Sequence, residues 1–273
     1  MAVQREIQAK SVLTKSGISD YSVNCYVGCL HNCVYCYARY MRKFTGHTEP
    51  WGQYLDVKVN APEVLAREVT RKKPGTIFFS SACDGWQPAE RKYQLTRRCL
   101  AIAAEAGFPI RALTKSGLIV RDLDILSSAP DASVGCTITT TDESIRRRIE
   151  IAADSSETRF AALEKARDAG IRTWAFCGPL MPALTDTPAN IEALFKRLAA
   201  LDVDSILVDK LNFRSGVFES TIDLLRRFYP HLIPVYLKLR FDQQEYEQYA
   251  AKLRVTVDEV ASAIGVTSKI TCV

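Results

Sequence analysis

The sequence has 273 residues, of which 47% are hydrophobic and 25% charged, a composition typical of a globular protein that excludes a largely disordered chain. No apolar run approaches the roughly 20 residues needed to span a bilayer, and the first residues lack the apolar segment of a signal peptide. The formal charge of +5 permits an anionic partner without requiring one. We therefore expect a cytoplasmic protein with no membrane partner.

The N-terminal part of the chain leads to a cysteine-rich loop. Residues 1–19 are polar, with a break at Gly17, and are expected to form an N-terminal arm. Residues 21–27 are rich in β-branched and aromatic side chains and predict the first strand. Residues 28–37 then form what we call the Cys loop, which carries three of the nine cysteines. An odd number of cysteines without an export signal favours reduced thiols or metal ligation over a disulfide scaffold.

The Cys loop has the spacing of a metal site. Cys29, Cys33 and Cys36 follow the order Cys-x3-Cys-x2-Cys, and such short gaps let a tight loop wrap around a cluster. Iron-sulfur clusters normally take four cysteines, and structural zinc takes four ligands. Three cysteines therefore predict an open metal position. The alternatives are a zinc knuckle, with His31 or Cys25 as fourth ligand, and three unrelated thiols.

Strand and helix patterns alternate regularly after the Cys loop. Predicted helices cover residues 61–72, 91–106, 122–127, 155–170 and 189–200, and predicted strands cover residues 76–80, 110–114, 132–139, 171–177 and 205–208. Repeated strand-helix units with right-handed crossovers give a parallel sheet. We therefore predict an α/β fold in which residues 20–210 form a partial (β/α)6 barrel of the TIM type.

The pattern is less regular beyond residue 210. Residues 211–273 are expected to form a C-terminal helical extension packed on the barrel. Within it, helices are predicted over residues 217–229, 242–254 and 257–264, and an extended apolar run over residues 232–237.

Polar residues and thiols collect where the predicted strands end, which is where parallel barrels place their functional groups. Asp84, Gln87 and Glu90 follow the second barrel strand and are candidates for positioning a substrate or capping the next helix; capping suits Glu90 best. His31 is expected to face solvent, and His47 has no evident partner. Tyr37, Trp51 and Trp86 could line a wall for a planar substrate or pack in the core.

Taken in order, these segments resemble the spore photoproduct lyase-like branch of the radical S-adenosylmethionine (SAM) enzymes. The resemblance lies in the Cys loop, the Asp-x-x-Gln-Pro-x-Glu segment from Asp84, the Thr-Lys pair ending at Lys115, an Arg-x-x-Glu segment ending at Glu150 and Pro179 after the fifth barrel strand. It covers roughly residues 20–185.

The resemblance implies a cofactor set and a chemistry. Cys29, Cys33 and Cys36 would hold a [4Fe-4S] cluster whose open iron binds SAM, and a one-electron donor such as flavodoxin or ferredoxin would reduce it. Reductive cleavage of SAM would give a 5′-deoxyadenosyl radical that abstracts hydrogen from a substrate. The enzyme would be of the lyase or transferase type.

Further site residues follow from the same resemblance. Tyr35 would lie near the adenine of SAM, Lys115 would contact SAM, and Thr137 would stand where the lyase uses a hydroxyl of its fourth strand to contact SAM. Ser81 is also expected among the residues that bind the cofactor. Glu150 and Arg159 would form an ion pair that braces the loop after strand four, or Glu150 would reach a ribose hydroxyl of SAM.

The sequence departs from the lyase pattern after the second barrel strand. Ser81 stands where the lyase has its hydrogen-donating cysteine, and an O–H bond is too strong to donate hydrogen readily to a carbon radical. Cys83 stands where the lyase has a serine, and is either a hydrogen donor on a rearranged loop or a small buried thiol. This departure argues against lesion repair by the lyase mechanism.

Three classes of function remain in view. The first is a radical SAM enzyme acting on a nucleic-acid base or lesion. The second is a radical SAM enzyme acting on a peptide or small metabolite. The third is a non-enzymatic metal-binding module used in regulation. The sequence gives no indication of the oligomeric state.

Overall fold

The structure, a computed structural model, describes residues 2–273. Its strands are β1 (Val3–Ile7), β2 (Leu13–Lys15), β3 (Tyr21–Val23), β4 (Tyr26–Val27), β5 (Tyr54–Lys58), β6 (Ile77–Phe79), β7 (Ile110–Thr114), β8 (Ala132–Thr137), β9 (Arg172–Leu180), β10 (Ser205–Lys210) and β11 (Ile270–Cys272).

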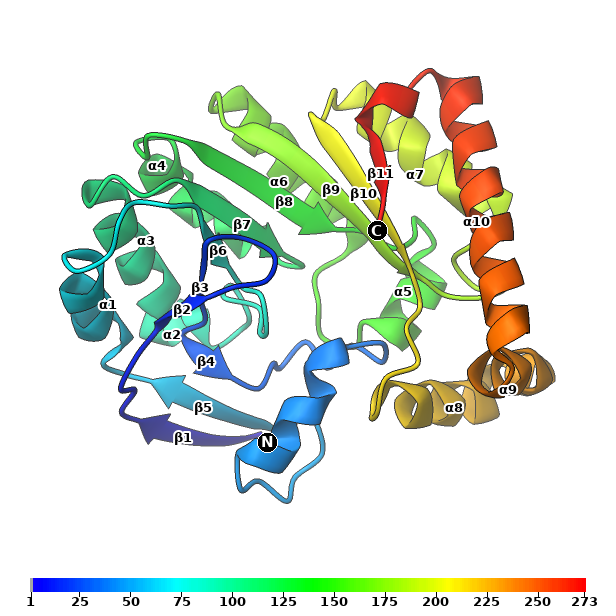
Figure 1. The fold of residues 1–273 in the computed structure, drawn as a ribbon, viewed down its shortest axis with the longest axis horizontal. Coiled ribbons are helices and arrows are strands. Elements are labelled where there is room, and N and C mark those ends of the chain that lie inside the picture. The colour runs from blue at the N-terminus through cyan, green and yellow to red at the C-terminus, as the bar shows by residue number, and fades with distance from the viewer. Residues whose placement is uncertain (1) are drawn as a thin grey trace.

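Over residues 2–273 the strands form two sheets (Figure 1). The larger sheet has the order β11-β10-β9-β8-β7-β6-β3-β2, and the smaller has the order β1-β5-β4. Strands β3 and β6 to β10 are neighbours in chain order and pair in parallel, whereas β2 pairs antiparallel with β3. These six parallel strands confirm the predicted partial (β/α)6 barrel, which stays open between β2 and β11.

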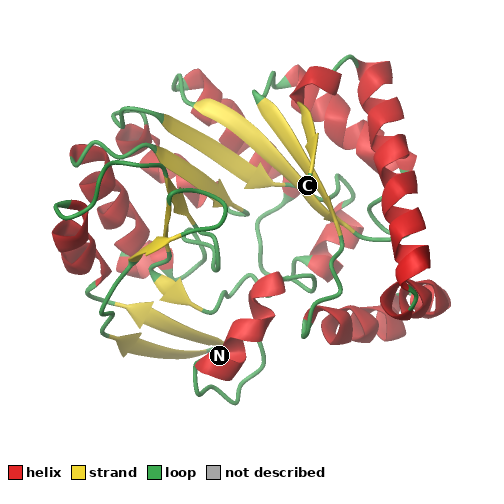
Figure 2. Ribbon diagram, in the orientation of Figure 1, coloured by secondary structure: helices red, strands yellow, loops and turns green. Residues whose placement is uncertain are grey.

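Helices cover the outside of the curved sheet (Figure 2). Their bounds are η1 (Tyr37–Phe44), α1 (Ala61–Val69), α2 (Glu90–Tyr93), α3 (Leu95–Glu105), η2 (Gly117–Asp122), α4 (Leu123–Leu126), α5 (Glu143–Ile149), α6 (Ser156–Asp168), α7 (Pro188–Ala200), α8 (Val217–Phe228), η3 (Pro230–Leu232), α9 (Ile233–Phe241), α10 (Gln243–Ile264) and η4 (Thr267–Lys269). Helix α3 packs on β7, and α6 packs on β8 and β9.

The alternation of side chains along a strand sets the inner face of the barrel. In β7, Ile110, Ala112 and Thr114 are buried, whereas Arg111 and Leu113 are only half-buried. The half-buried set lies on the face that no helix covers, and Lys115 continues it past the end of the strand. The chain thus directs the Lys115 side chain to the C-terminal mouth of the barrel.

Several elements differ from the sequence-based expectations. The N-terminal arm contains β1 and β2, which pair with β5 and β3. Residues 232–237 are not extended: α9 begins at Ile233, with Pro234 in its first turn, where proline is compatible with a helix. The helix expected over residues 91–106 is broken at Gln94, whose φ is +50°. Helix α5 was not predicted, although the side chain of Asp142 accepts hydrogen bonds from its first turn.

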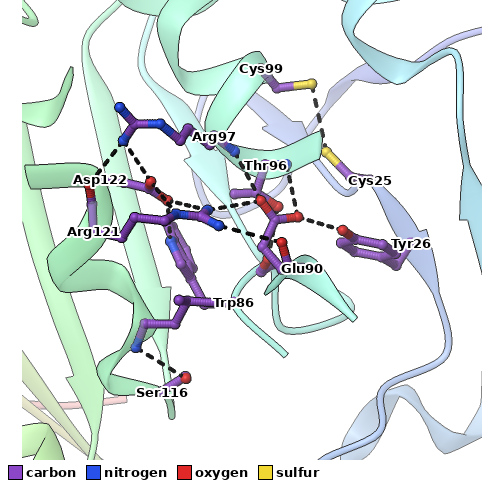
Figure 3. A network of polar contacts seen from close by, with 12 residues as sticks. Cys25, Tyr26, Trp86, Glu90, Thr96, Arg97, Cys99, Ser116, Arg121 and Asp122 are labelled. Carbon is purple, nitrogen blue, oxygen red and sulfur yellow. Dashed lines mark hydrogen bonds and ion pairs between the residues drawn. The ribbon is translucent and has the colours of Figure 1, made fainter. Parts of the chain in front are cut away.

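A buried carboxylate, Glu90, joins the start of α3 to the strand before the Cys loop (Figure 3). The backbone N–H groups of Thr96 and Arg97 each donate to it at 3.1 Å. Arg121 contributes an ion pair at 3.0 Å, and the hydroxyl of Tyr26 donates to the same carboxylate. The expectation that Glu90 caps the following helix is confirmed.

A second carboxylate, Asp122, completes this network. It accepts from Nε1 of Trp86 at 2.8 Å and pairs with Arg97 at 2.9 Å and with Arg121 at 2.7 Å. Glu90, Asp122 and Trp86 are 0–1% exposed. Buried charges are tolerated because each one meets several partners.

Replacing Glu90 tests the importance of this network. We expect Glu90→Gln to lower the free energy of unfolding by about 3 kcal/mol, because it breaks a buried ion pair and leaves Arg121 without that counter-charge. Glu63→Gln is the matched control, because this carboxylate pairs with Arg98 at the surface, with side chains about half exposed, and should change stability by less than about 0.5 kcal/mol. Urea denaturation measures both; equal effects would contradict the prediction.

Candidate functional site

The Cys loop is built from successive tight turns. The carbonyl of Cys29 accepts from the N–H of Asn32, that of Cys33 from Cys36, and that of Cys36 from Arg39, each at 3.3 Å. Each of the three cysteines is therefore the first residue of a tight turn, and the three thiols follow one another along a short segment of chain.

Glycine at position 28 lets the chain enter this loop beside β5. Gly28 has a φ of +92°, and a Cβ there would stand 2.7 Å from the backbone oxygen of Tyr54. A larger residue would have to move the strand or the loop. The close approach explains why the loop starts with glycine.

The loop is held by contacts from residues far away in sequence. Gln87, which is fully buried, accepts from the N–H of Leu30 at 2.8 Å and donates to the carbonyl of Gly28 at 3.4 Å, so it fixes both neighbours of Cys29. On the other side, the N–H of Val34 donates to the carbonyl of Ile149 at 2.8 Å. The loop is thus fixed by its backbone.

The three thiols lie near one another and near one cation. Burial raises the pKa of Cys33; Lys115 lowers it in part, while Glu150 and the thiols of Cys36 and Cys29 raise it further. Burial also raises the pKa of Cys29 and of Cys36. Within residues 2–273, no three His, Cys, Asp or Glu side chains form a ready site for a single ion. A donor set of three thiols and no carboxylate fits an iron-sulfur cluster, which takes its thiolates on separate irons.

The zinc alternative named two possible fourth ligands, and each has another partner in the structure. His31 lies 3.3 Å from Asp84, measured from Nδ1 to Oδ2. The thiol of Cys25 lies 3.6 Å from that of Cys99. His31 is also 2% exposed, so the expectation that it faces solvent is wrong. Its side chain is buried against Asp84, which lies in the segment after β6.

Lys115, Thr137 and Tyr35 meet at the mouth of the barrel although they are far apart in sequence. Nζ of Lys115 donates to Oγ1 of Thr137 at 3.4 Å and lies 5.9 Å from the centre of the Tyr35 ring. Burial lowers the pKa of Lys115, but Cys33 and Glu150 outweigh it and raise the pKa overall. The ammonium is therefore charged at neutral pH and faces the Cys loop.

Glu150 and Arg159 form the expected ion pair beneath this group. Both side chains are 0% exposed, and Arg159 also donates to the carbonyl of Thr137 at 2.8 Å. The hydroxyls of Tyr35 and Thr139 donate to the Glu150 carboxylate. Burial opposes ionisation of Glu150, but Arg159 more than compensates and lowers the pKa of this carboxyl. The pair therefore fixes the orientation of Tyr35.

Ser81 and Cys83 are placed by Asn24, which sequence reasoning missed. The side-chain amide of Asn24 donates to Oγ of Ser81 at 2.8 Å, and its oxygen accepts from the N–H of Ala82 at 2.8 Å and of Cys83 at 3.3 Å. Burial raises the pKa of Cys83 to about 12, so the thiol keeps its hydrogen at neutral pH. An asparagine directly after β3 was the only available signal.

Asp84 contacts three residues at the mouth of the barrel. It accepts from the hydroxyl of Thr114 at 2.7 Å and from the N–H of Lys115 at 2.7 Å, in addition to its contact with His31. Burial opposes its ionisation, yet His31 and Lys115 lower the pKa of the carboxyl overall. Asp84 positions the backbone of the site and has no free oxygen aimed at a substrate.

The aromatic residues divide between core and surface. Trp51 is 4% and Trp86 1% exposed, so both pack in the core, and the proposed aromatic wall does not include them. Tyr37 is 45% exposed, and its hydroxyl donates to the carbonyl of Ser81. His47, for which the sequence showed no partner, lies between Glu49 at 3.0 Å and Asp56 at 2.9 Å.

Comparisons with known proteins agree on the family. An uncharacterized protein of Methanocaldococcus jannaschii is 35% identical over 184 residues, which cover 66% of this chain and 69% of that protein. A radical SAM Nalpha-GlyT isomerase of Pseudomonas phage M6 is 24% identical over 201 residues, which cover 73% of this chain and 39% of the isomerase.

No helix within residues 2–273 has both the length and the apolar character to cross a bilayer.

Solved structures share the fold. Spore photoproduct lyase complexed with dinucleoside spore photoproduct superimposes with a TM-score of 0.70 at 14% identity, over 98% of this chain and 81% of the lyase. A double mutant of the same lyase with bound SAM and the dinucleoside gives a TM-score of 0.71 at 14% identity, over 98% and 80%.

The sequence pattern of the radical SAM superfamily matches residues 23–208, a range that includes the Cys loop, Lys115, Thr137 and Glu150. Enzymes of this superfamily need a one-electron reductant. Since the match spans more than half of the chain, the protein belongs to the radical SAM superfamily, whose members use a [4Fe-4S] cluster and SAM.

Proposed function

We propose that this protein cleaves SAM reductively and uses the resulting radical to abstract hydrogen from a substrate. In this proposal Cys29, Cys33 and Cys36 hold the cluster. The observation that carries it is the meeting of Lys115 and Thr137, 3.4 Å apart, beside the Cys loop at the barrel mouth. A cation and a hydroxyl beside three thiols suit a ligand that carries a carboxylate and ribose hydroxyls.

Each residue of the mouth has a distinct part in this proposal. When held by the three cysteines, the cluster would supply one electron for the cleavage of SAM into methionine and a 5′-deoxyadenosyl radical. Lys115 supplies the positive charge that attracts the SAM carboxylate, and Thr137 orients the Lys115 ammonium and offers a hydroxyl to SAM. Glu150 and Arg159 hold the Tyr35 ring where the adenine would lie. We assign Glu150 to positioning, because its carboxylate is fully buried among protein donors.

Cys83 is the proposed source of a returning hydrogen atom. Its thiol is protonated at neutral pH and lies 3.7 Å from the side-chain oxygen of Asn24, next to Ser81. An S–H bond gives up a hydrogen atom to a carbon radical far more readily than an O–H bond does. We therefore assign Ser81 to the hydrogen bond with Asn24 that holds the loop. We assign Cys83 to the donation of a hydrogen atom.

A nucleic-acid base or lesion is the proposed substrate, supported by exposed rings with nearby cations at the C-terminal ends of α8 and of α9, which together we call the α8–α9 surface. Phe228 is 38% and Phe241 72% exposed. Guanidinium groups lie over both rings: Arg148 at 4.9 Å and Arg227 at 5.0 Å from the centre of Phe228, and Arg240 at 5.4 Å from that of Phe241. Exposed aromatic rings interleaved with cations are typical of surfaces that bind single strands.

The rival substrate class is a peptide or small metabolite. The phage relative is named as an isomerase and shows that an enzyme of this superfamily matches most of the chain. The lyase solved with a dinucleoside shares only the fold with this chain, so the preference for nucleic acid rests on the α8–α9 surface.

A pair of substitutions separates cluster binding from SAM binding. Cys36→Ala should abolish the iron-sulfur absorbance of reconstituted protein, because it removes one thiolate ligand. Lys115→Met should retain about four irons per chain and weaken SAM binding at least about tenfold, because the ammonium is lost. Cys272→Ala and Lys196→Met are the controls. Normal loading of Cys36→Ala, or unchanged SAM affinity of Lys115→Met, would contradict the assignment.

Salt-dependent binding tests the substrate class. The holoprotein should bind a single-stranded oligonucleotide with a logarithmic affinity that falls linearly with the logarithm of salt concentration. Arg227→Ser/Arg240→Ser should reduce this slope by about 1.4, which corresponds to two phosphate contacts on a single strand. Arg71→Ser/Lys73→Ser, outside the α8–α9 surface, is the control and should keep the slope. A flat response in the wild type would favour the rival class.

Deuterium transfer tests Cys83 without a substrate. When SAM is cleaved in deuterated water without substrate, the 5′-deoxyadenosyl radical should abstract deuterium from the solvent-exchanged thiol of Cys83 and leave a thiyl radical there. We therefore expect deuterium in the 5′-deoxyadenosine of the wild type. Cys83→Ala should lose this label, whereas Ser81→Ala should keep it. Mass spectrometry of the nucleoside decides, and a label that persists in Cys83→Ala would assign the hydrogen source elsewhere.

A further inference from the structure

The helix that follows the Cys loop presents a compact basic surface. Of the residues of η1 (Tyr37–Phe44), only Ala38 is buried. The helix contains three basic residues and no acidic one. The exposed residues from Tyr40 onward define what we call the η1 surface: Tyr40, Arg42, Lys43 and Phe44. Tyr37 is also exposed, but its hydroxyl donates to the carbonyl of Ser81.

This surface is joined directly to the Cys loop. Cys36 immediately precedes η1 and is more exposed than Cys29 and Cys33. Arg39, within the helix, donates to the carbonyl of Cys33 at 2.9 Å and to the side chain of Asn32 at 3.3 Å. A group docked on η1 is therefore connected to the thiols through a short and rigid segment of chain.

The two sides of the Cys loop differ in their neighbours. On the inner side, the Lys115 ammonium and the Tyr35 ring occupy the barrel mouth, where the proposed function places SAM and the substrate. On the outer side, the chain runs through Cys36 into the exposed η1 helix. A reductant that approached through the barrel mouth would compete with SAM, whereas the η1 surface offers exposed side chains a few residues from Cys36.

We propose that the η1 surface is the docking site for an acidic one-electron donor protein. This inference rests on the proposed function, because it names the partner that delivers an electron to the same Cys loop. The charge of the helix complements an acidic partner, and charge complementarity steers association. Electron-transfer complexes bury small interfaces, which a helix of this size with exposed rings at its end can supply.

The aromatic rings of η1 give this surface apolar contact area beside its cations. Nζ of Lys43 lies 5.2 Å from the centre of the Phe44 ring, and Tyr40 meets the same ring edge-on at 6.5 Å and 82°. Phe44 is thus engaged on its face and edge, although it is 75% exposed. These contacts leave an apolar rim beside two cations, which suits a protein partner.

Charge reversal on the η1 surface tests the proposal. Reconstituted holoprotein is titrated with flavodoxin as the probe, at low and at high salt, by calorimetry. Arg42→Glu/Lys43→Glu should weaken binding at low salt at least about tenfold, because steering charges are reversed. Arg71→Glu/Lys73→Glu, which makes the same change of charge before the N-terminal end of β6, should bind like the wild type. Both variants should be reduced by dithionite at the wild-type rate.

Three outcomes would overturn the proposal. The first is equal flavodoxin affinity in both variants and the wild type, and the second is no binding by the wild type of either flavodoxin or an acidic ferredoxin. The third is a loss of oligonucleotide binding in Arg42→Glu/Lys43→Glu with flavodoxin binding retained. Failure of the proposed function would give a different result: the wild type would not cleave SAM with dithionite.

Discussion

The position of the Cys loop depends on a carboxylate that has no access to solvent. Glu150 is 0% exposed and is ionised because Arg159, equally buried, lies against it. The cost of burying this pair is offset only when its remaining donors and acceptors also find partners. Tyr35, a residue of the Cys loop, donates its hydroxyl hydrogen to Glu150, and the backbone N–H of Val34 donates to the carbonyl of Ile149. The loop is therefore attached to the barrel through the same residues that place an aromatic ring beside Lys115.

The segment after β6 serves the loop from the opposite side. Gln87 bonds the backbone on both sides of Cys29, Asp84 holds His31 and the start of Lys115, and Glu90 caps α3 while it binds Tyr26. Each of these side chains points in a different direction, because they lie on a loop and a helix turn. A short polar segment thereby aligns a strand, a helix and the Cys loop. This alignment leaves the interior of the mouth to Lys115 and Thr137.

The site has an inner and an outer side that suit different partners. The inner side combines the Lys115 ammonium with the Thr137 hydroxyl, which the proposed function assigns to a small polar cofactor. The outer side combines exposed aromatic rings with Arg42 and Lys43. In the two proposals, the electron donor docks on the η1 surface and the substrate binds at the barrel mouth.

The sequence alone determined the order of the barrel strands and most helices, and the placing of Lys115 and Thr137 at strand ends. These features are local or follow from the rule that parallel strands share one functional edge. The sequence predicted one strand over residues 21–27 before the Cys loop, whereas the structure has β3 in the larger sheet and β4, which precedes the loop, in the smaller one. It missed α5, broke α10 in two, and left His31 and His47 without partners. Only the tertiary structure decided that Asn24 orients Ser81, that Gln87 fixes the Cys loop, and that Trp86 lies in the core. The reason is physical: the contacts of Asn24, Gln87 and His31 join residues more than 50 positions apart, and that of Trp86 with Asp122 joins residues 36 apart. The partner of a buried polar group is chosen by packing rather than by the neighbouring sequence.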